Sequence, residues 1–266
     1  MKKKILVLSD HPLSPSGVGT QTKYMIEALL KTGRYQFVCL GGAVKHKDYT
    51  PQRVDPWGDD WRIFPVDGYG NPEIIRSILQ KERPDVLWFM TDPRFYGWLW
   101  EIENEVRANV PMVYYHVWDN YPYPTYNKPN YDSNDFIATI SKVTDDIVAN
   151  VSPDVDRQYV PHAVNLDVFK PLEDDFVEQL RADNFKENKD KFIVFWNNRN
   201  ARRKMGATLI LWFKDFLDRV GHDKAVLLMH TNPRDQAGSN LEALIEDLEL
   251  NDGQVLFSRE KLHPEN

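Results

Sequence analysis

Short apolar runs alternate with amphipathic stretches along most of the chain. Residues 4–8 form a short apolar run between a charge cluster and a turn, which is typical of a parallel strand buried on both faces. Apolar residues recur at helical spacing over 20–31, and residues 36–40 form a second apolar run. The glycine-containing segment 11–19 is predicted to be a loop. This order of strand, loop, helix and strand predicts a βαβ unit.

The same alternation continues to about residue 161. It predicts helices that begin at 71 and cover 96–107 and 142–151, and strands at 86–90, 111–116, 136–140 and 158–161. Strands and helices of these lengths in alternation indicate a parallel sheet with helices on both faces.

Residues 166–190 differ in character. They are charged and aperiodic apart from a short helical pattern around Phe176 and Leu180, so we interpret them as a connection between domains. The alternation restarts beyond them, with helices at 207–220 and 241–248 and strands at 192–196, 225–230 and 255–257. We therefore predict two Rossmann-like α/β domains, 1–165 and 166–266. Three strands are fewer than an open α/β sheet normally has, so the second domain is either small or incomplete.

Composition and charge narrow the function classes. The 266 residues carry a formal net charge of −7, which argues against a general nucleic-acid binder but leaves room for a small basic phosphate pocket. The N-terminal apolar run stops at Ser9, too short for the core of a signal peptide, and no later stretch reaches the length of a membrane span. Cys39 is the single cysteine. We expect a soluble cytoplasmic protein, with peripheral membrane contact left open.

The glycine loop is the first candidate site. Gly17 and Gly19 lie between the first strand and its helix, where backbone N–H groups can approach a phosphate. A dinucleotide site would need a further glycine at position 22, which is Thr22, and an acid at the end of the second strand, where Gly42 stands instead. The segment therefore predicts a phosphate-binding loop or a tight turn, and no NAD site.

A cluster of basic residues is the second candidate. It follows the strand at 192–196 and precedes the next helix, the edge of an open α/β sheet where ligands bind. Its members are Arg199, Arg202, Arg203 and Lys204. Arginine, lysine and helix-end N–H groups can neutralise a diphosphate. The alternative is a solvated basic turn, which the placement disfavours.

The third candidate is His116 with its loop. A histidine at the carboxyl end of a buried strand can contact a ligand oxygen or act as acid or base, or it can simply bond into the loop. Trp118, Asp119 and Tyr121 follow it, and these rings and this carboxylate could contact an acceptor or pack the loop. The Asp-x-Asp pair at 154–156 is given no metal role, and no other residues have metal-ligand spacing.

These residues together resemble the GT-B glycosyltransferases, above all the large retaining family numbered four. The resemblance covers nearly the whole chain and rests on residues 5–8 with 16–20, His116, 139–141, the hinge 160–165 followed by Phe169 and Pro171, and Arg199 with Lys204. It implies an N-terminal acceptor domain and a C-terminal domain that binds a nucleotide-sugar donor, with no other cofactor. Arg199 and Lys204 would hold the donor diphosphate and stabilise the leaving group. Gly17 and Gly19 would approach the donor, and His116 would contact the transferred sugar.

Two departures from the family pattern are visible. The hinge has His162 and Ala163 where the family has Asn-Gly, and the family's acidic motif would lie past Asn266. The resemblance implies a glycosyltransferase that acts on a carbohydrate or other hydroxyl acceptor and retains the configuration of the transferred sugar. The alternatives are a non-catalytic sugar- or phosphate-binding module, an inactive partial chain, and a sugar-nucleotide epimerase of the same fold. The hinge and the Arg–Lys spacing favour the transferase.

Overall fold

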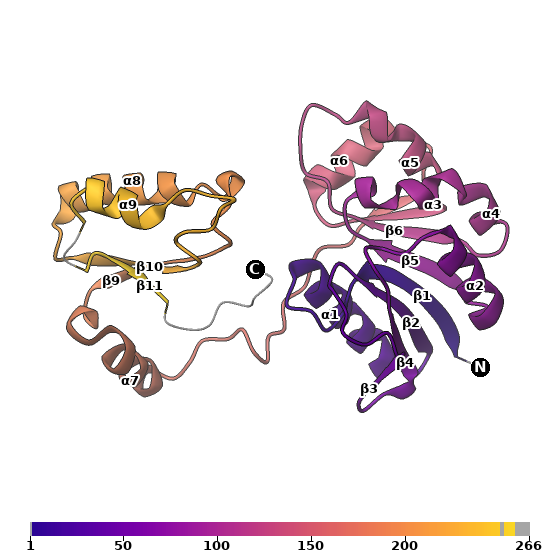
Figure 1. Ribbon diagram of the computed structural model, residues 1–266, viewed down its shortest axis with the longest axis horizontal. Helices are drawn as coiled ribbons and strands as arrows, with labels where there is room; N and C mark the ends of the chain where they lie inside the picture. The colour runs from indigo at the N-terminus through magenta and orange to yellow at the C-terminus, as the bar shows by residue number, and fades with distance from the viewer. Residues whose placement is uncertain (1, 251–252, 259–266) are drawn as a thin grey trace. The chain divides into compact units, whose positions relative to one another are not determined.

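The computed structural model describes residues 2–250 and 253–258, and it divides into two compact units. The first runs from Met1 to Phe169 and the second starts at Lys170, a few residues after the boundary expected from the sequence. Residues 259–266 of the predicted second domain lie outside the described residues. Each unit is an α/β domain, as predicted (Figure 1).

The first unit is built on an eight-stranded sheet in the order β3-β4-β2-β1-β5-β6-β7-β8. All neighbouring strands are parallel except β3, which pairs antiparallel with β4 at the edge. The strands are β1 (Lys3–Asp10), β2 (Tyr35–Gly42), β3 (Gln52–Val54), β4 (Gly58–Pro65), β5 (Val86–Met90), β6 (Met112–His116), β7 (Phe136–Thr139) and β8 (Arg157–Tyr159).

Helices cover both faces of this sheet, which explains the continuous apolar runs in its central strands β1, β2 and β5. Val7 packs with α1 in one core, whereas its neighbours Leu6 and Leu8 join the helices of the opposite face. The helices are α1 (Gly17–Lys31), α2 (Pro72–Glu82), α3 (Gly97–Glu101), α4 (Glu103–Arg107), α5 (Lys128–Asp132) and α6 (Lys142–Val151). No helix in the ranges that the structure describes is long and apolar enough to cross a membrane.

The predicted helix over 96–107 is wrong in detail. The segment begins as the 3-10 helix η1 (Pro93–Tyr96) and continues as α3 and α4, which Ile102 separates. Ile102 leaves the helical region, with φ −115° and ψ 15°. The apolar spacing continues through this break because all three pieces pack on the same core, so periodicity alone reads them as one helix.

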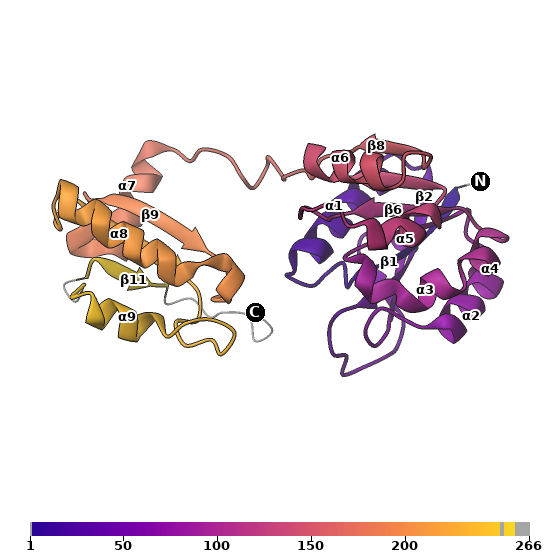
Figure 2. The same ribbon diagram turned by 90° about the horizontal axis from the view of Figure 1, so that it is seen from above.

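The second unit has a three-stranded parallel sheet in the order β11-β10-β9. Its strands are β9 (Phe192–Asn197), β10 (Ala225–His230) and β11 (Val255–Phe257), and its helices are α7 (Asp174–Phe185), α8 (Gly206–Val220) and α9 (Leu241–Asp247). Helices α8 and α9 cover one face of the sheet, and α7 lies on the other face (Figures 1 and 2). The segment interpreted as a connection thus contains a helix, α7, none of whose residues is buried.

Candidate functional site

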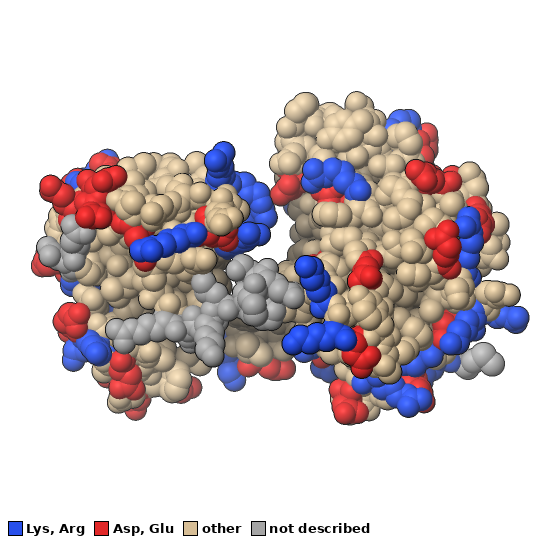
Figure 3. Space-filling model, viewed as in Figure 1, with Lys and Arg blue, Asp and Glu red and all other residues tan. Residues whose placement is uncertain are grey.

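The basic cluster lies in the segment between β9 and α8. Arg199 follows β9, and Lys204 closes the short helix η4 (Arg202–Lys204) just before α8. Figure 3 shows Lys and Arg side chains gathered at the end of the second unit where α8 begins. Met205 enters α8 in a left-handed conformation, φ 54°, and gives it no side-chain cap. The first N–H groups of this long helix therefore keep their partial positive charge beside the cluster.

Arg199 is held in place by an aspartate. Its Nε lies 2.8 Å from Asp235 Oδ2 and its NH2 lies 3.3 Å from Asp235 Oδ1. The Arg199 side chain is 56% exposed, whereas the Asp235 side chain is only 11% exposed. The hydrogen bond from Arg199 lowers the pKa of Asp235, and Asp235 raises the pKa of Arg199. The pair is therefore charged on both sides, with one edge of the guanidinium turned to solvent.

The loops that follow β9 and β10 are bound to each other. The buried Asn200 donates from Nδ2 to Ser239 O at 2.7 Å and to Pro233 O at 3.3 Å, and Arg202 N donates to Ala237 O at 3.1 Å. A Cβ at Gly238 would lie 2.2 Å from Asn200 O, so a glycine is required there for the loops to approach. This basic edge is preformed rather than a set of independent surface side chains.

The glycine segment differs from the prediction. Gly17 and Gly19 lie in the first turn of α1 rather than in a loop, because Ser16 caps the helix and accepts a hydrogen bond from Gly19 N at 2.9 Å. A Cβ at Gly19 would lie 2.6 Å from both His11 O and Ser14 Oγ, whereas one at Gly17 would meet open space. Gly19 is therefore a packing residue whose N–H is already bonded, and Gly17 keeps a first-turn N–H.

Asp10, which sequence reasoning did not select, is the carboxylate beside this segment. It ends β1, is 7% exposed, and accepts hydrogen bonds from Ser16 Oγ at 2.6 Å and from Tyr69 Oη at 2.8 Å. Burial, and then the charge of Asp10, raises the pKa of Tyr69. The available signal in the sequence is an acidic residue at the carboxyl end of a buried strand.

His116 lies deeper than predicted. Its side chain is 0% exposed, and its Nε2 lies 2.7 Å from Tyr131 Oη. Burial lowers the pKa of His116 to about 3, so the imidazole is neutral at ordinary pH. Its Nδ1 has no hydrogen-bond partner among the described residues. Of the two alternatives for His116, these contacts favour a histidine bonded within the protein, because the ring faces the core and not solvent.

The loop after β6 carries the other predicted residues. Trp118 is partly buried and lies 6.1 Å from the exposed ring of Tyr126, centroid to centroid, while Asp119 is exposed. Tyr121 is exposed, and its hydroxyl donates to Asp146 Oδ2 at 3.1 Å. The hydroxyl of Tyr123 donates to the same oxygen at 2.9 Å, so Asp146 on α6 ties this loop down at two points.

Asp92 and Arg94, which follow β5, lie at the same carboxyl edge of the first sheet. The sequence analysis did not select them. Asp92 Oδ1 accepts from Arg94 N at 3.0 Å and from Arg94 Nε at 2.8 Å. Partial burial opposes ionisation of Asp92, but these bonds outweigh it and lower its pKa. The guanidinium of Arg94 lies 5.9 Å from the ring centre of Trp118, so the β5 and β6 loops meet.

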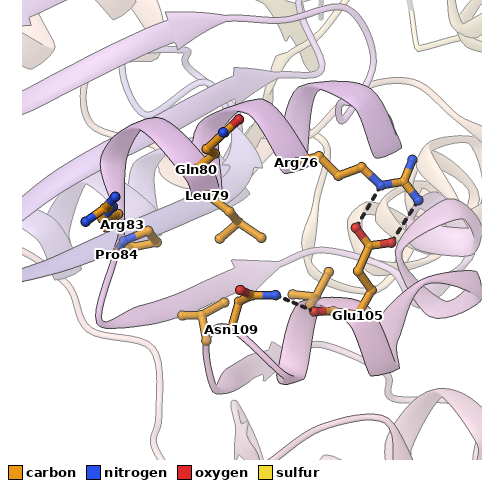
Figure 4. A pocket seen from close by; sticks show the side chains of 9 residues that line it. Arg76, Leu79, Gln80, Arg83, Pro84, Glu105 and Asn109 are labelled. Carbon is orange, nitrogen blue, oxygen red and sulfur yellow. Dashed lines mark hydrogen bonds and ion pairs between the residues drawn. The ribbon is translucent and has the colours of Figure 1, made fainter.

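A separate pocket lies between α2 and α4. It has a volume of about 470 Å³ and is lined in part by Leu79, Gln80 and Asn109 (Figure 4). Arg76 and Glu105 join its two helices by two bonds of 2.8 Å. Pro84 on its wall precedes β5, so it lies at the amino edge of the sheet, away from the residues discussed above. Arg76 and Glu105 neutralise each other, and Arg83 is a second arginine on the wall of the pocket.

No described part of the chain gathers three or more histidine, cysteine, aspartate or glutamate side chains that could hold a metal ion. The Asp-x-Asp pair, 154–156, lies in a turn before β8.

Comparison with known proteins identifies the fold. No protein-family model and no curated protein matches the chain. It is similar to the solved structure titled trehalose-6-phosphate from E. coli bound with UDP-2-fluoro glucose, with a TM-score of 0.65, 13% identity, and coverage of 99% of this chain and 75% of that one. An α,α-trehalose 6-phosphate synthase from Burkholderia multivorans matches with a TM-score of 0.66 and 10% identity, covering 100% and 75%. A glycosyltransferase from Rickettsia africae matches with 0.68 and 16%, covering 97% and 69%.

Identities this low bear on the fold alone. The chain has the two-domain GT-B fold of these proteins, which confirms the fold class predicted from the sequence.

Proposed function

We propose that this chain acts as a glycosyltransferase that moves a sugar from a nucleotide-sugar donor to a hydroxyl acceptor. The observation that carries the proposal is the preformed basic edge of the second unit. There, in a protein of net charge −7, Arg199 and Lys204 flank the start of the uncapped helix α8. A nucleotide sugar leaves its diphosphate behind when the sugar is transferred. Cationic side chains and helix N–H groups fixed beforehand stabilise the charge that develops there.

The neighbours support the choice of ligand. One is titled as bound with UDP-2-fluoro glucose, and another, an α,α-trehalose-phosphate synthase from Burkholderia xenovorans, is titled as a complex with glucose-6-phosphate. We assign Arg199 and Lys204 to the donor diphosphate. Retention of configuration rests on the resemblance to the retaining family.

The acceptor is assigned to the first unit. Its carboxyl edge offers the ring of Trp118, the exposed Asp119 and the exposed Tyr121, whose amphipathic surfaces suit a carbohydrate. We assign His116 no contact with the acceptor, because it is buried beneath this edge and bonded to Tyr131.

Incubation with a panel of nucleotide sugars tests the proposal. We expect release of a nucleoside diphosphate from one donor of the panel, faster when the correct hydroxyl acceptor is present. Binding of a donor without release would favour the non-catalytic module. Conversion of the donor to its epimer without any acceptor would favour the epimerase.

A further inference from the structure

Asp235 lies beside the proposed donor site but has been given no role in it. Its carboxylate lies beside a site assigned to a diphosphate, where a negative charge opposes anion binding. It is 11% exposed and belongs to the loop after β10, not to the basic segment itself.

The local geometry fixes this carboxylate in one orientation. Oδ1 accepts a hydrogen bond from Ala237 N at 2.9 Å, in addition to the contact with Arg199 NH2. The backbone of the same turn is closed by Gly238 N donating to Asp235 O at 3.0 Å. Asp235 is therefore set by its own turn before it binds the arginine.

The arginine is held by one edge of its fork. Asp235 takes Nε and one hydrogen of NH2, and no bond to NH1 is found among the described residues. Arginine presents five N–H donors in a planar arrangement, so a guanidinium fixed on one edge keeps donors on the other for a second anion. Fixing a flexible side chain beforehand lowers the entropy lost when a ligand binds.

We propose that Asp235 is a positioning residue, which holds Arg199 so that the free edge of its guanidinium meets the diphosphate. The inference rests on the proposed function, since it presumes that Arg199 binds the donor. It gives the β10 loop a part in a site that the sequence places in the β9 loop alone.

A positioning role and simple electrostatics predict opposite changes in the affinity of the Asp235→Asn variant for a diphosphate. Removal of a negative charge near an anion site should by charge alone tighten binding about two- to fourfold. Loss of the charged grip on Arg199 should weaken it about tenfold, because a charge-assisted bond becomes a neutral one. Asp215→Asn is the matched control, since Asp215 pairs with Arg219 on the exposed surface of α8 and lies far along the helix from its first turn.

Calorimetric titration of the full chain with inorganic pyrophosphate and with UDP measures these effects. We expect about tenfold weaker binding for Asp235→Asn, less than a twofold change for Asp215→Asn, and no further loss when Asp235→Asn is added to Arg199→Ala. Unchanged or tighter binding by Asp235→Asn would overturn the inference, and so would a loss that adds fully to that of Arg199→Ala.

A second variant avoids any effect of Asp235 on its own turn. Arg199→Lys keeps the charge but cannot be gripped on one edge while offering another. We expect it to bind pyrophosphate nearly as weakly as Arg199→Ala, and near-normal binding would overturn the inference. If Arg199→Ala itself binds pyrophosphate and UDP as the unaltered chain does, the donor-site assignment fails instead, so the two failures are distinguishable.

Discussion

The carboxyl edges of the two sheets have opposite chemistry. In the first unit, two polar groups at the strand ends are buried and bonded within the unit: Asp10 to Ser16 and Tyr69, and His116 to Tyr131. In the second unit, the exposed Arg199 and the partly exposed Lys204 lie beside a helix N-terminus without a side-chain cap.

The difference separates two tasks that one fold can perform. An edge with bonded carboxylates and exposed rings suits a ligand with many hydroxyls and little charge. An open basic edge suits a polyanion, because cationic donors remain available to it. The same α/β architecture thus supplies either surface, depending on whether its strand-end groups are buried, like Asp10 and His116, or remain exposed, like Arg199.

The largest effect is expected when the cationic side chains of the basic edge are removed. Arg199→Ala and Lys204→Ala should each lower the turnover rate about ten- to a hundredfold, because the charge on the leaving diphosphate grows in the transition state. Arg202→Ala and Arg203→Ala are the controls, since both side chains are exposed and should matter less. Steady-state kinetics with thermal melts on the four variants decides it. Equal, small effects at all four positions would mean a solvated turn.

The next prediction concerns the closed packing at the first edge. Gly19→Ala should lower the free energy of unfolding by about 1–3 kcal/mol, because its Cβ would overlap with backbone and side-chain oxygens. Gly17→Ala lies two positions earlier in the same turn and meets open space, so it should change little. Urea unfolding of both variants gives the comparison, and equal losses would show that the Gly19 contact carries no special cost.

The burial of His116 predicts a dependence of stability on pH. Its pKa is about 3 in the folded chain, below the value of about 6.5 expected when unfolded, so the unfolded chain binds the proton first as the pH falls. This contribution is present above pH ~6.5 and is lost at lower pH, by about 1.4 kcal/mol per unit. Urea titrations between pH ~7 and ~5 should show the slope, reduced by that amount in His116→Gln. An unchanged slope would mean that His116 is protonated without unfolding.

The smallest effect is expected at the tyrosine loop. Asp146→Ala removes the acceptor shared by Tyr121 and Tyr123, and should raise the acceptor KM about two- to fivefold through a looser loop. The donor KM should stay unchanged. Asp132→Ala, which breaks an exposed pair with Lys128 on α5, is the control. A change confined to the donor KM would remove the loop from the acceptor site.

Much of the fold follows from hydrophobic spacing. The sequence predicts the strands at 86–90, 225–230 and 255–257 and the helix at 142–151 with the ends they have, because each carries a clear apolar pattern that packs on a core. For helix α7 the sequence offers only a short helical pattern around Phe176 and Leu180 within a charged segment, because the helix buries no residue and therefore lacks a continuous apolar face. The sequence does not reveal the break at Ile102, because the apolar pattern continues through it.

The site was predictable only where its residues are local in sequence. Arg199 and Lys204 stand out as a basic run at a strand end. Asp235 does not, because the two loops meet through the pairing of β9 with β10, and nothing in the sequence says which of the many acidic residues completes the arginine. The depth of His116 depends on the ring of Tyr131, whose position comes from packing rather than from spacing.

The contact of Gly238 with Asn200 has a consequence for protein engineering. Because the β9 and β10 loops contact each other through this glycine, they form a single structural unit. A chimera that imports the basic segment without residues 233–239 would carry the charges but not their arrangement. Crossover points for swapping donor preference therefore belong within the strands and helices that flank both loops, and directed libraries would gain more by varying the two segments jointly than one at a time.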